Sequence, residues 1–197
     1  MFIVLTILFL GVLHEDTPLY FKVKRNKVDL PCDDSVVDLY LWSVALLAEH
    51  GFEQYEVSNF ALPGFQSRHN SVYWDRKPYK GFGLGACSFD GARRLQNEKN
   101  LMSYMSAIEN DKEVTSFVEE LLPQQVRLEK IMLGLRRSAG IAFKDMCEDL
   151  TNEEQEQLKQ RVAWLIEHKF VQKNDDMLVL TPAALALENE IVLKLSL

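Results

Sequence analysis

Residues 33–61 read DDSVVDLYLWSVALLAEHGFEQYEVSNFA and contain two structural signals in succession. Apolar side chains recur at helical spacing, at Val37, Tyr40, Val44 and Leu47. Asp33 or Asp34 suits the N-cap, and Gly51 stands where a left-handed residue follows a helix. The pattern predicts a helix through His50 and then a strand over residues 52–59.

An apolar run, FIVLTILFLGVL at residues 2–13, precedes this segment. It is shorter than the roughly 20 residues that a membrane-spanning helix requires, and no Lys or Arg precedes it as in a signal peptide. Such a run is typical of a strand buried on both faces of a parallel sheet. We therefore expect a buried strand. The alternatives are a membrane or signal role and a frayed chain end that results from an unusual start codon. The order strand, helix, strand then predicts a parallel sheet.

Two long loops are expected on either side of the helix–strand segment. Residues 17–31 form a basic loop of the kind that usually covers a solvated surface, and residues 61–80 show neither helical nor alternating periodicity. Loops as long as the second one tend to be functional. It leads into GFGLGACSF, residues 81–89, where alternate glycines in a strand-like setting imply close approach of a ligand or another backbone. A helix over about 98–110 follows.

A compact, mostly helical module is expected from about residue 116, so the predicted domains are 1–115 and 116–197. Pro123 suits the start of its first helix, and Gly140 suits a position after that helix ends. The remaining predicted elements are a short helix over 141–150, a helix from the capping box Thr151–Glu154 to His168, strands at 170–173 and 177–180, and a last helix from Thr181-Pro182. This order is winged-helix-like.

Composition and charge restrict the function. The 197 residues are 47% hydrophobic and 26% charged, which is typical of a globular protein with a real core. Twenty-nine acidic against 22 basic residues give a net charge of −7. The module itself has fourteen acidic and ten basic residues, a balance that repels phosphates. We therefore expect no nucleic-acid partner and interpret the module as a docking or lid domain.

The three cysteines, Cys32, Cys87 and Cys147, are far apart in the sequence and include no C-x-x-C pair. This spacing excludes a zinc-ribbon, thioredoxin-like or ferredoxin-like site. Dispersed single cysteines suit a reducing compartment, so a cytoplasmic location is expected.

The strongest chemical signal lies in residues 68–80, RHNSVYWDRKPYK, which carry four basic side chains and one acidic side chain. A neutral imidazole can ligate haem iron, aromatic rings can lie against a porphyrin, and Arg or Lys can pair with its propionates. His69 is thus a candidate iron ligand. The alternative is a hydrogen-bonded structural histidine. His14 lies near the chain start, and His50 and His168 suit last helical turns, where a cation favours the helix dipole.

Several segments together resemble a known family: Thr17-Pro18-Leu19-Tyr20, Tyr55-Glu56-Val57-Ser58-Asn59-Phe60-Ala61, Pro63-Gly64-Phe65, Ser67-Arg68-His69-Asn70, Tyr73-Trp74 and Gly83-x-Gly85-Ala86-x-Ser88. The sequence resembles the radical S-adenosylmethionine family that contains the oxygen-independent coproporphyrinogen III oxidase and the HemW-type haem chaperones. The resemblance covers most of the chain beyond residue 16. It implies an α/β fold, with the C-terminal part of a partial (β/α) barrel followed by the winged-helix-like domain.

The resemblance also implies site residues. His69-Asn70-Ser71-Val72-Tyr73-Trp74 matches the family's H-N-x-x-Y-W motif, which is associated with haem binding in the chaperone branch. It implies His69 as haem-iron ligand, with Arg68, Asn70, Tyr73 and Trp74 as supporting contacts. The residues that would face S-adenosylmethionine and the cluster are Glu56, Ser58, Asn59, Gly83, Gly85, Ala86 and Ser88.

Three departures from the family pattern qualify the function. The C-x-x-x-C-x-x-C motif that binds the [4Fe-4S] cluster is absent, Cys87 stands where His is expected in G-A-H-S, and residues 2–13 do not match the usual strand. The chain is expected to be the C-terminal half of a HemW-like protein. Such a chain cannot by itself cleave S-adenosylmethionine reductively.

Three functions remain open at this point. The first is a haem-binding, HemW-like chaperone that transfers haem to an acceptor protein, with membrane contact only through that acceptor. The second is part of a coproporphyrinogen dehydrogenase-like enzyme, which requires the missing cluster motif. The third is a remnant without a ligand, whose exposed sheet edges would make it unstable.

Overall fold

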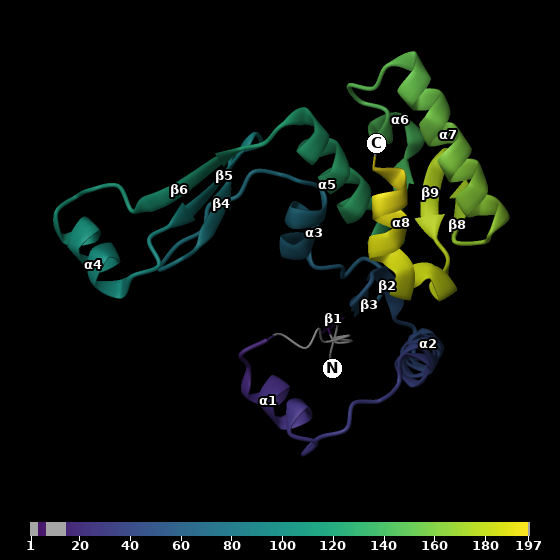
Figure 1. The fold of residues 1–197 in the computed structure, drawn as a ribbon, viewed down its shortest axis with the longest axis horizontal. Coiled ribbons are helices and arrows are strands. Elements are labelled where there is room, and N and C mark those ends of the chain that lie inside the picture. The colour runs from purple at the N-terminus through teal and green to yellow at the C-terminus, as the bar shows by residue number, and fades with distance from the viewer. Residues whose placement is uncertain (1–3, 7–14, 197) are drawn as a thin grey trace.

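The computed structural model describes residues 4–6 and 15–196 (Figure 1). Its helices are α1 (Pro18–Lys24), α2 (Asp33–Glu49), α3 (Arg68–Trp74), α4 (Leu101–Glu109), α5 (Pro123–Leu135), α6 (Phe143–Met146), α7 (Asn152–Glu167), the 3₁₀ helix η1 (Pro182–Leu187) and α8 (Glu188–Leu195). Its strands are β1 (Val4–Thr6), β2 (Glu53–Glu56), β3 (Asn59–Ala61), β4 (Cys87–Phe89), β5 (Arg93–Asn97), β6 (Thr115–Glu120), β7 (Ile141–Ala142), β8 (Val171–Asn174) and β9 (Met177–Leu180). The mixed helix and strand content confirms the α/β class.

The described strands form three sheets of three strands, in the orders β1-β3-β2, β4-β5-β6 and β7-β9-β8. Every strand pair in this part of the chain is antiparallel. The predicted parallel sheet is therefore wrong here. The cause is a tight hairpin: the chain reverses between Glu56 and Asn59, so β3 lies between β1 and β2.

The helix expected before this hairpin is confirmed as α2, with Cys32 rather than an aspartate at the N-cap and Gly51 in a left-handed conformation at φ +80°. The single strand expected over 52–59 is wrong, because that segment forms β2 and the turn into β3. Of the predicted strand over residues 2–13, residues 4–6 are β1, and the other nine lie outside the described residues.

Both predicted loops contain a short helix. In the basic segment, the Thr17 side chain accepts a hydrogen bond from the Tyr20 amide at 3.2 Å and caps α1. In the 61–80 segment, the Ser67 side chain accepts from the Asn70 amide at 3.2 Å and caps α3. Each helix has only seven residues, which is too short for apolar periodicity to reveal it.

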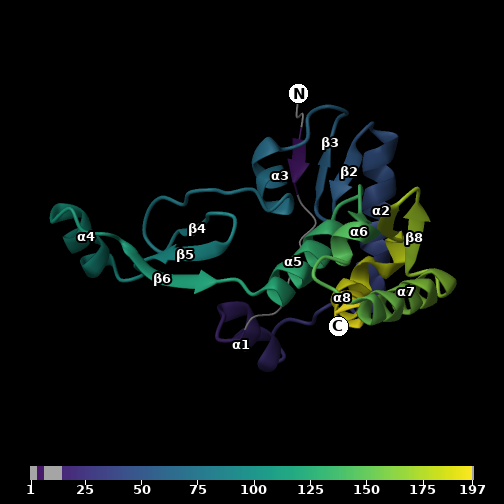
Figure 2. The same cartoon turned by 90° about the horizontal axis from the view of Figure 1, so that it is seen from above.

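Strands β4, β5 and β6 form an arm that projects away from the rest of the molecule, with α4 at its far end (Figures 1 and 2). The helix predicted over 98–110 is confirmed as α4, which begins after the Asn100 cap. Residues 115–120 belong to this arm as β6, although the predicted domain division falls at residue 115. The position of that boundary stays a prediction.

The main hydrophobic core of the described residues lies in the C-terminal module. Its buried members come from every element between α5 and α8: Ile131, Leu135, Ile141, Met146, Leu150, Leu158, Val162, Leu165, Val171, Leu178, Leu180, Ala184, Ile191, Val192 and Leu195. Outside this module the buried apolar residues of the described chain are Tyr40, Phe60, Ala61 and Phe89. The C-terminal module thus contains the main hydrophobic core, and the N-terminal elements pack against this module.

The module has the predicted winged-helix-like order, with α5, α6 and α7 followed by the hairpin β8–β9 and by α8. The Thr151–Glu154 capping box is present at the start of α7. Two details differ from the prediction. Residues 141–150 form the short strand β7 and only one turn of helix, α6, and the last helical segment begins as the 3₁₀ helix η1.

The β2–β3 hairpin is attached to the module by backbone hydrogen bonds. The Val57 amide donates to the Arg136 carbonyl at 3.0 Å, and the Ser138 amide donates to the Tyr55 carbonyl at 3.3 Å. Tyr40 of α2 extends the contact, because its hydroxyl donates to the Val57 carbonyl at 3.0 Å. The turn after α5 therefore positions the hairpin and α2 together.

Replacing Gly140 in this turn by Ala tests the packing of the module. Gly140 has φ +73°, and a Cβ there would lie 2.2 Å from the Leu178 carbonyl oxygen. We expect the free energy of unfolding to fall by about 1–2 kcal/mol for the backbone conformation and by a further 1–3 kcal/mol for the clash. Urea denaturation measures the change.

Gly64→Ala is the matched control, because Gly64 has φ +81° and open space where its Cβ would lie. In this control the free energy of unfolding should fall only by the part that comes from the backbone conformation. Equal losses in the two variants would contradict the close approach of Gly140 to β9.

Candidate functional site

Helix α3 presents His69 and Tyr73 together on one exposed face, because residues four apart lie one above the other on a helix. The Tyr73 hydroxyl and His69 Nε2 are 3.1 Å apart, and the two rings pack edge to face with centroids 5.0 Å apart. Tyr73 also packs edge to face on Tyr79 at 4.7 Å. In the described part of the chain, His69 Nδ1 has no hydrogen-bond partner. One imidazole nitrogen therefore remains available to a ligand.

The other residues of the predicted haem motif point to different surroundings. Arg68 is exposed and has no ion-pair partner within residues 4–6 and 15–196. Asn70 is half-buried, and its backbone amide donates to the Ser67 side chain that caps α3. Trp74 lines a larger cavity, and its buried Nε1 has no hydrogen-bond partner there. The structure thus brings His69 and Tyr73 together but places Trp74 on another side of α3.

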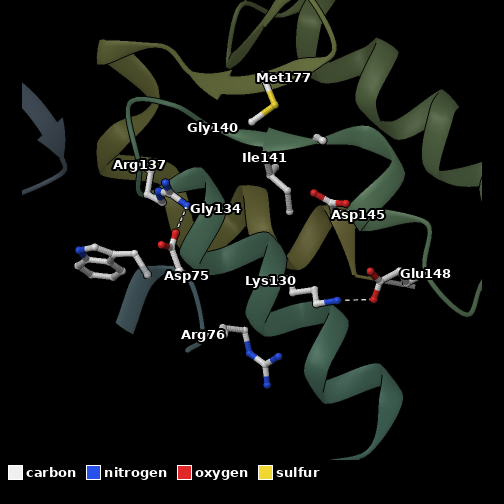
Figure 3. A pocket seen from close by; sticks show the side chains of 12 residues that line it. Asp75, Arg76, Lys130, Gly134, Arg137, Gly140, Ile141, Asp145, Glu148 and Met177 are labelled. Atoms are coloured by element: carbon white, nitrogen blue, oxygen red, sulfur yellow. Dashed lines mark hydrogen bonds and ion pairs between the residues drawn. The ribbon is translucent and has the colours of Figure 1, made fainter. Parts of the chain in front are cut away.

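The cavity that Trp74 lines has a volume of about 450 Å³ and lies between the end of α3 and the module. Figure 3 shows Asp75 directed toward Arg137, with which it forms a 2.7 Å ion pair, and Lys130 paired with Glu148. A hydrogen bond from Lys77 and the charge of Arg137 lower the pKa of Asp75. Most charged groups of this cavity are therefore already paired within the protein.

The first group of predicted cofactor-facing residues lies in the β2–β3 hairpin. Glu56 and Asn59 are buried, and the Asn59 amide nitrogen donates a short hydrogen bond to the Glu56 carboxylate. Burial raises the pKa of Glu56, although hydrogen bonds from Ser58 and Asn59 and the charge of Arg136 act in the opposite direction. Asn59 Oδ1 is buried without a hydrogen-bond partner among the described residues. These polar groups sit where the hairpin meets the module.

The second group, Gly83 to Ser88, belongs mainly to a turn rather than to the strand-like segment expected. Gly83 and Gly85 have φ of +100° and +65°. Ser88 is buried, and its hydroxyl accepts from the Gly81 amide at 3.0 Å. A Cβ on Gly81 would lie 2.1 Å from the Cys87 carbonyl oxygen, so at Gly81 the close neighbour is another backbone.

The structure does not bring these two groups into one sheet. Glu56, Ser58 and Asn59 lie at the β2–β3 hairpin, whereas Gly83, Gly85, Ala86 and Ser88 belong to the arm, which projects away from the hairpin (Figures 1 and 2). The Gly85 amide donates to the Glu98 carbonyl at 2.9 Å, toward the end of the arm that carries α4. Their role in cofactor binding stays a prediction.

The cysteines do not converge. Cys32 occupies the N-cap position of α2, Cys87 begins β4, and Cys147 follows α6. Within the described residues, no group of three or more His, Cys, Asp and Glu side chains is placed to hold a metal ion. The described residues therefore do not fit a four-iron cluster.

Sequence reasoning missed the partners that long-range folding supplies. Arg137 pairs with Asp75, and Arg94 and Glu129 approach Arg76, from elements far along the chain. No local periodicity or motif could have indicated these pairs.

The fold and site define an α/β protein with a winged-helix-like C-terminal module and an exposed His–Tyr pair on a short helix beside it. Residues 121–187 match the family model of the HemN C-terminal domain. The structure is similar to the coproporphyrinogen III oxidase HemN of Escherichia coli, a radical SAM enzyme, with a TM-score of 0.65 and 16% identity over 91% of this chain and 45% of that one. That likeness supports the fold.

Similarity in sequence points more specifically to the HemW proteins than similarity in structure does. The heme chaperone HemW of Lactococcus lactis is 36% identical over 66% of this chain and 34% of its own length. The heme chaperone HemW of Bacillus subtilis is 30% identical over 70% of this chain and 36% of its own. The chain thus spans about a third of the length of these relatives. Together the comparisons confirm the resemblance to the HemW and HemN proteins. None of the helices in the described ranges has the length and apolar character needed to cross a membrane.

Replacing the buried Glu56 by Gln tests the electrostatics of the hairpin. A raised pKa means that the folded state holds the proton more tightly than the unfolded state, so ionised Glu56 costs stability at neutral pH. We expect Glu56→Gln to unfold at higher urea than wild type at pH 7. The difference should shrink as pH falls through the folded pKa and vanish below the ordinary value of about 4.3.

Glu53→Gln is the control, because Glu53 is exposed on the same strand and its replacement should change stability by less than about 0.5 kcal/mol. A Glu56→Gln variant that is less stable than wild type at pH 7, with no dependence on pH, would contradict the account of this carboxyl.

Proposed function

We propose that this chain binds haem through His69 and releases it to an acceptor protein, as a HemW-like haem chaperone. The observation that carries the proposal is the exposed His69–Tyr73 pair within the H-N-x-x-Y-W motif. Similarity to proteins named heme chaperone HemW supports it. Cysteine usage supports a reducing, cytoplasmic setting, since all three thiols are free.

Under this proposal the two imidazole nitrogens of His69 have separate roles. Nε2 lies 3.1 Å from the Tyr73 hydroxyl, whose oxygen can accept a hydrogen bond from Nε2–H, while Nδ1 has no partner in the described part of the chain. Metal-ligating histidines usually donate their second N–H to a fixed acceptor, which sets the tautomer and the ring orientation. Tyr73 would thus hold Nε2 protonated and leave the Nδ1 lone pair for iron.

The composition of residues 65–82, the segment that contains α3, suits a flat, amphipathic and anionic ligand. Tyr73, which contacts His69, and Phe65 and Phe82 of this segment are exposed aromatic side chains, at 39%, 52% and 87%. Arg68 and Lys80 are exposed cations in the same segment. Haem supplies an iron centre with an open axial position, an apolar ring and two carboxylates. An exposed site of this kind also suits release of haem to another protein.

His69→Ala should abolish most of the Soret change seen when hemin is titrated into the protein, because the axial ligand is lost. His50→Ala is the control, since His50 is exposed at the end of α2 with its ring bonded to the Leu46 carbonyl at 2.8 Å. Absorption titration measures both. Identical spectra for wild type and His69→Ala would contradict ligation by His69.

Tyr73→Phe should keep the Soret band but weaken hemin binding by about tenfold, because loss of such an outer partner typically costs 10–100-fold in metal affinity. The ring is retained, so only the hydroxyl is tested. Tyr104→Phe, on the distant helix α4, is the matched control. An unchanged dissociation constant in Tyr73→Phe would show that the hydroxyl does not orient the imidazole.

A further inference from the structure

A second, smaller cavity of about 160 Å³ is lined in part by Tyr73 of the His69–Tyr73 pair. It is lined by Tyr73, Arg76, Tyr79, Phe89, Arg94, Glu129 and Leu133. Its walls come from α3, from the arm and from α5, and the Tyr79–Phe89 backbone bridge fixes one side. Since Tyr73 also contacts His69, the cavity and the imidazole share one side chain.

The polar lining of this cavity has one more positive charge than negative charge. Arg76 Nε donates to Glu129 Oε2 at 2.8 Å, and Arg94 pairs with the other oxygen of the same carboxylate. Arg94 also reaches Glu119, which lies outside the cavity, at 3.2 Å. Two guanidinium groups therefore share a single carboxylate within the cavity.

The guanidinium group of Arg76 has fewer hydrogen bonds than it can make. Its side chain is 11% exposed, and Nη2 is buried without a hydrogen-bond partner in the described part of the chain. The guanidinium lies over the Phe89 ring, 5.0 Å from its centroid. Burial and the nearby charge of Arg94 lower the pKa of Arg76. An additional anion would supply the acceptor that Arg76 Nη2 lacks.

The backbone at Arg76 is held in an unusual conformation that directs this side chain. Its φ is +49°, and its amide donates to the Tyr73 carbonyl at 3.0 Å. Non-glycine residues in this region are uncommon and concentrate at ligand-binding sites. Figure 3 shows the guanidinium of Arg76 directed away from the neighbouring Asp75–Arg137 pair. Arg76 lines both cavities, but its guanidinium contacts Phe89 and Glu129, which line the smaller one.

We propose that this cavity is a carboxylate-binding site in which Arg76 and Arg94 hold a propionate of the haem whose iron His69 ligates. The haem part of this inference rests on the proposed function. The volume equals that of about five water molecules, which is enough for a carboxyethyl group. Planar guanidinium groups suit bidentate recognition of such a carboxylate.

The first experiment tests the carboxylate site without haem. Sodium propionate is titrated into the full chain, and the arginine Nε–Hε resonances are followed by NMR. We expect a saturable shift for Arg76 and Arg94 that neutral propionamide does not produce. Arg94→Gln should lose the response, whereas Arg93→Gln should keep it, because Arg93 is exposed and pairs with Asp90 outside the cavity. Absence of any saturable shift in wild type would overturn the site.

The second experiment tests the haem propionate. Hemin and its dimethyl ester, which lacks the carboxylate charges, are titrated into wild type, Arg94→Gln and Arg76→Lys. Wild type should bind hemin about tenfold more tightly than the ester. In both variants the dissociation constant for hemin should rise toward that for the ester, and the dissociation constant for the ester should stay as in wild type. Arg76→Lys keeps the charge and removes the planar fork, so it tests recognition apart from charge.

The outcomes separate this inference from the proposed function. If hemin binding requires His69 but hemin and its ester bind equally well, the propionate assignment is wrong and the haem proposal stands. If hemin does not bind while propionate shifts Arg76, the proposed function fails and the cavity remains a site for a free carboxylate.

Discussion

The backbone bridge between residues 55–57 and 136–138 joins the two parts of this structure. On one side lies the module, whose core is the only extended cluster of buried apolar side chains in the described chain. On the other lie α2 and the β2–β3 hairpin, which bury few apolar groups of their own. The bridge and the Asp75–Arg137 pair fix the hairpin and the end of α3 against α5. The position of His69 therefore depends on how the turn after α5 is formed.

The sequence predicted those elements whose formation depends on residues that are close together in the chain. The long helix α2, the capped helices α4 and α7 and the wing strands follow from apolar spacing, capping residues and turn residues, which act within a few positions. The parallel sheet was wrong because nothing in residues 52–59 indicated that the chain reverses at Val57-Ser58, and pairing direction depends on that reversal. Helices α1 and α3 were missed because seven residues show less than two full apolar repeats.

The sequence predicted the part of the candidate site that a local motif determines, but not the part that long-range packing determines. His69 and Tyr73 are four residues apart, so any helix over this segment places them together, and the motif identified both. Trp74 was expected beside them, but helical geometry turns it toward the larger cavity. Arg94 and Glu129 could not be predicted, because they reach Arg76 only through the packing of the arm and α5. The proposed haem site, which combines His69, Tyr73 and Arg76, thus draws on one local motif and one long-range ion-pair network.

Resonance Raman spectroscopy of the ferrous haem complex tests the central claim, that the imidazole of His69 ligates iron, most directly. Protein with ¹⁵N-labelled histidine is compared with unlabelled protein, so that an iron–histidine stretching band is identified by its isotope shift. The account predicts this band in wild type, its loss in His69→Gly, and its return when free imidazole is added to that variant. An isotope-sensitive band that persists in His69→Gly, or a wild-type complex without one, would contradict it.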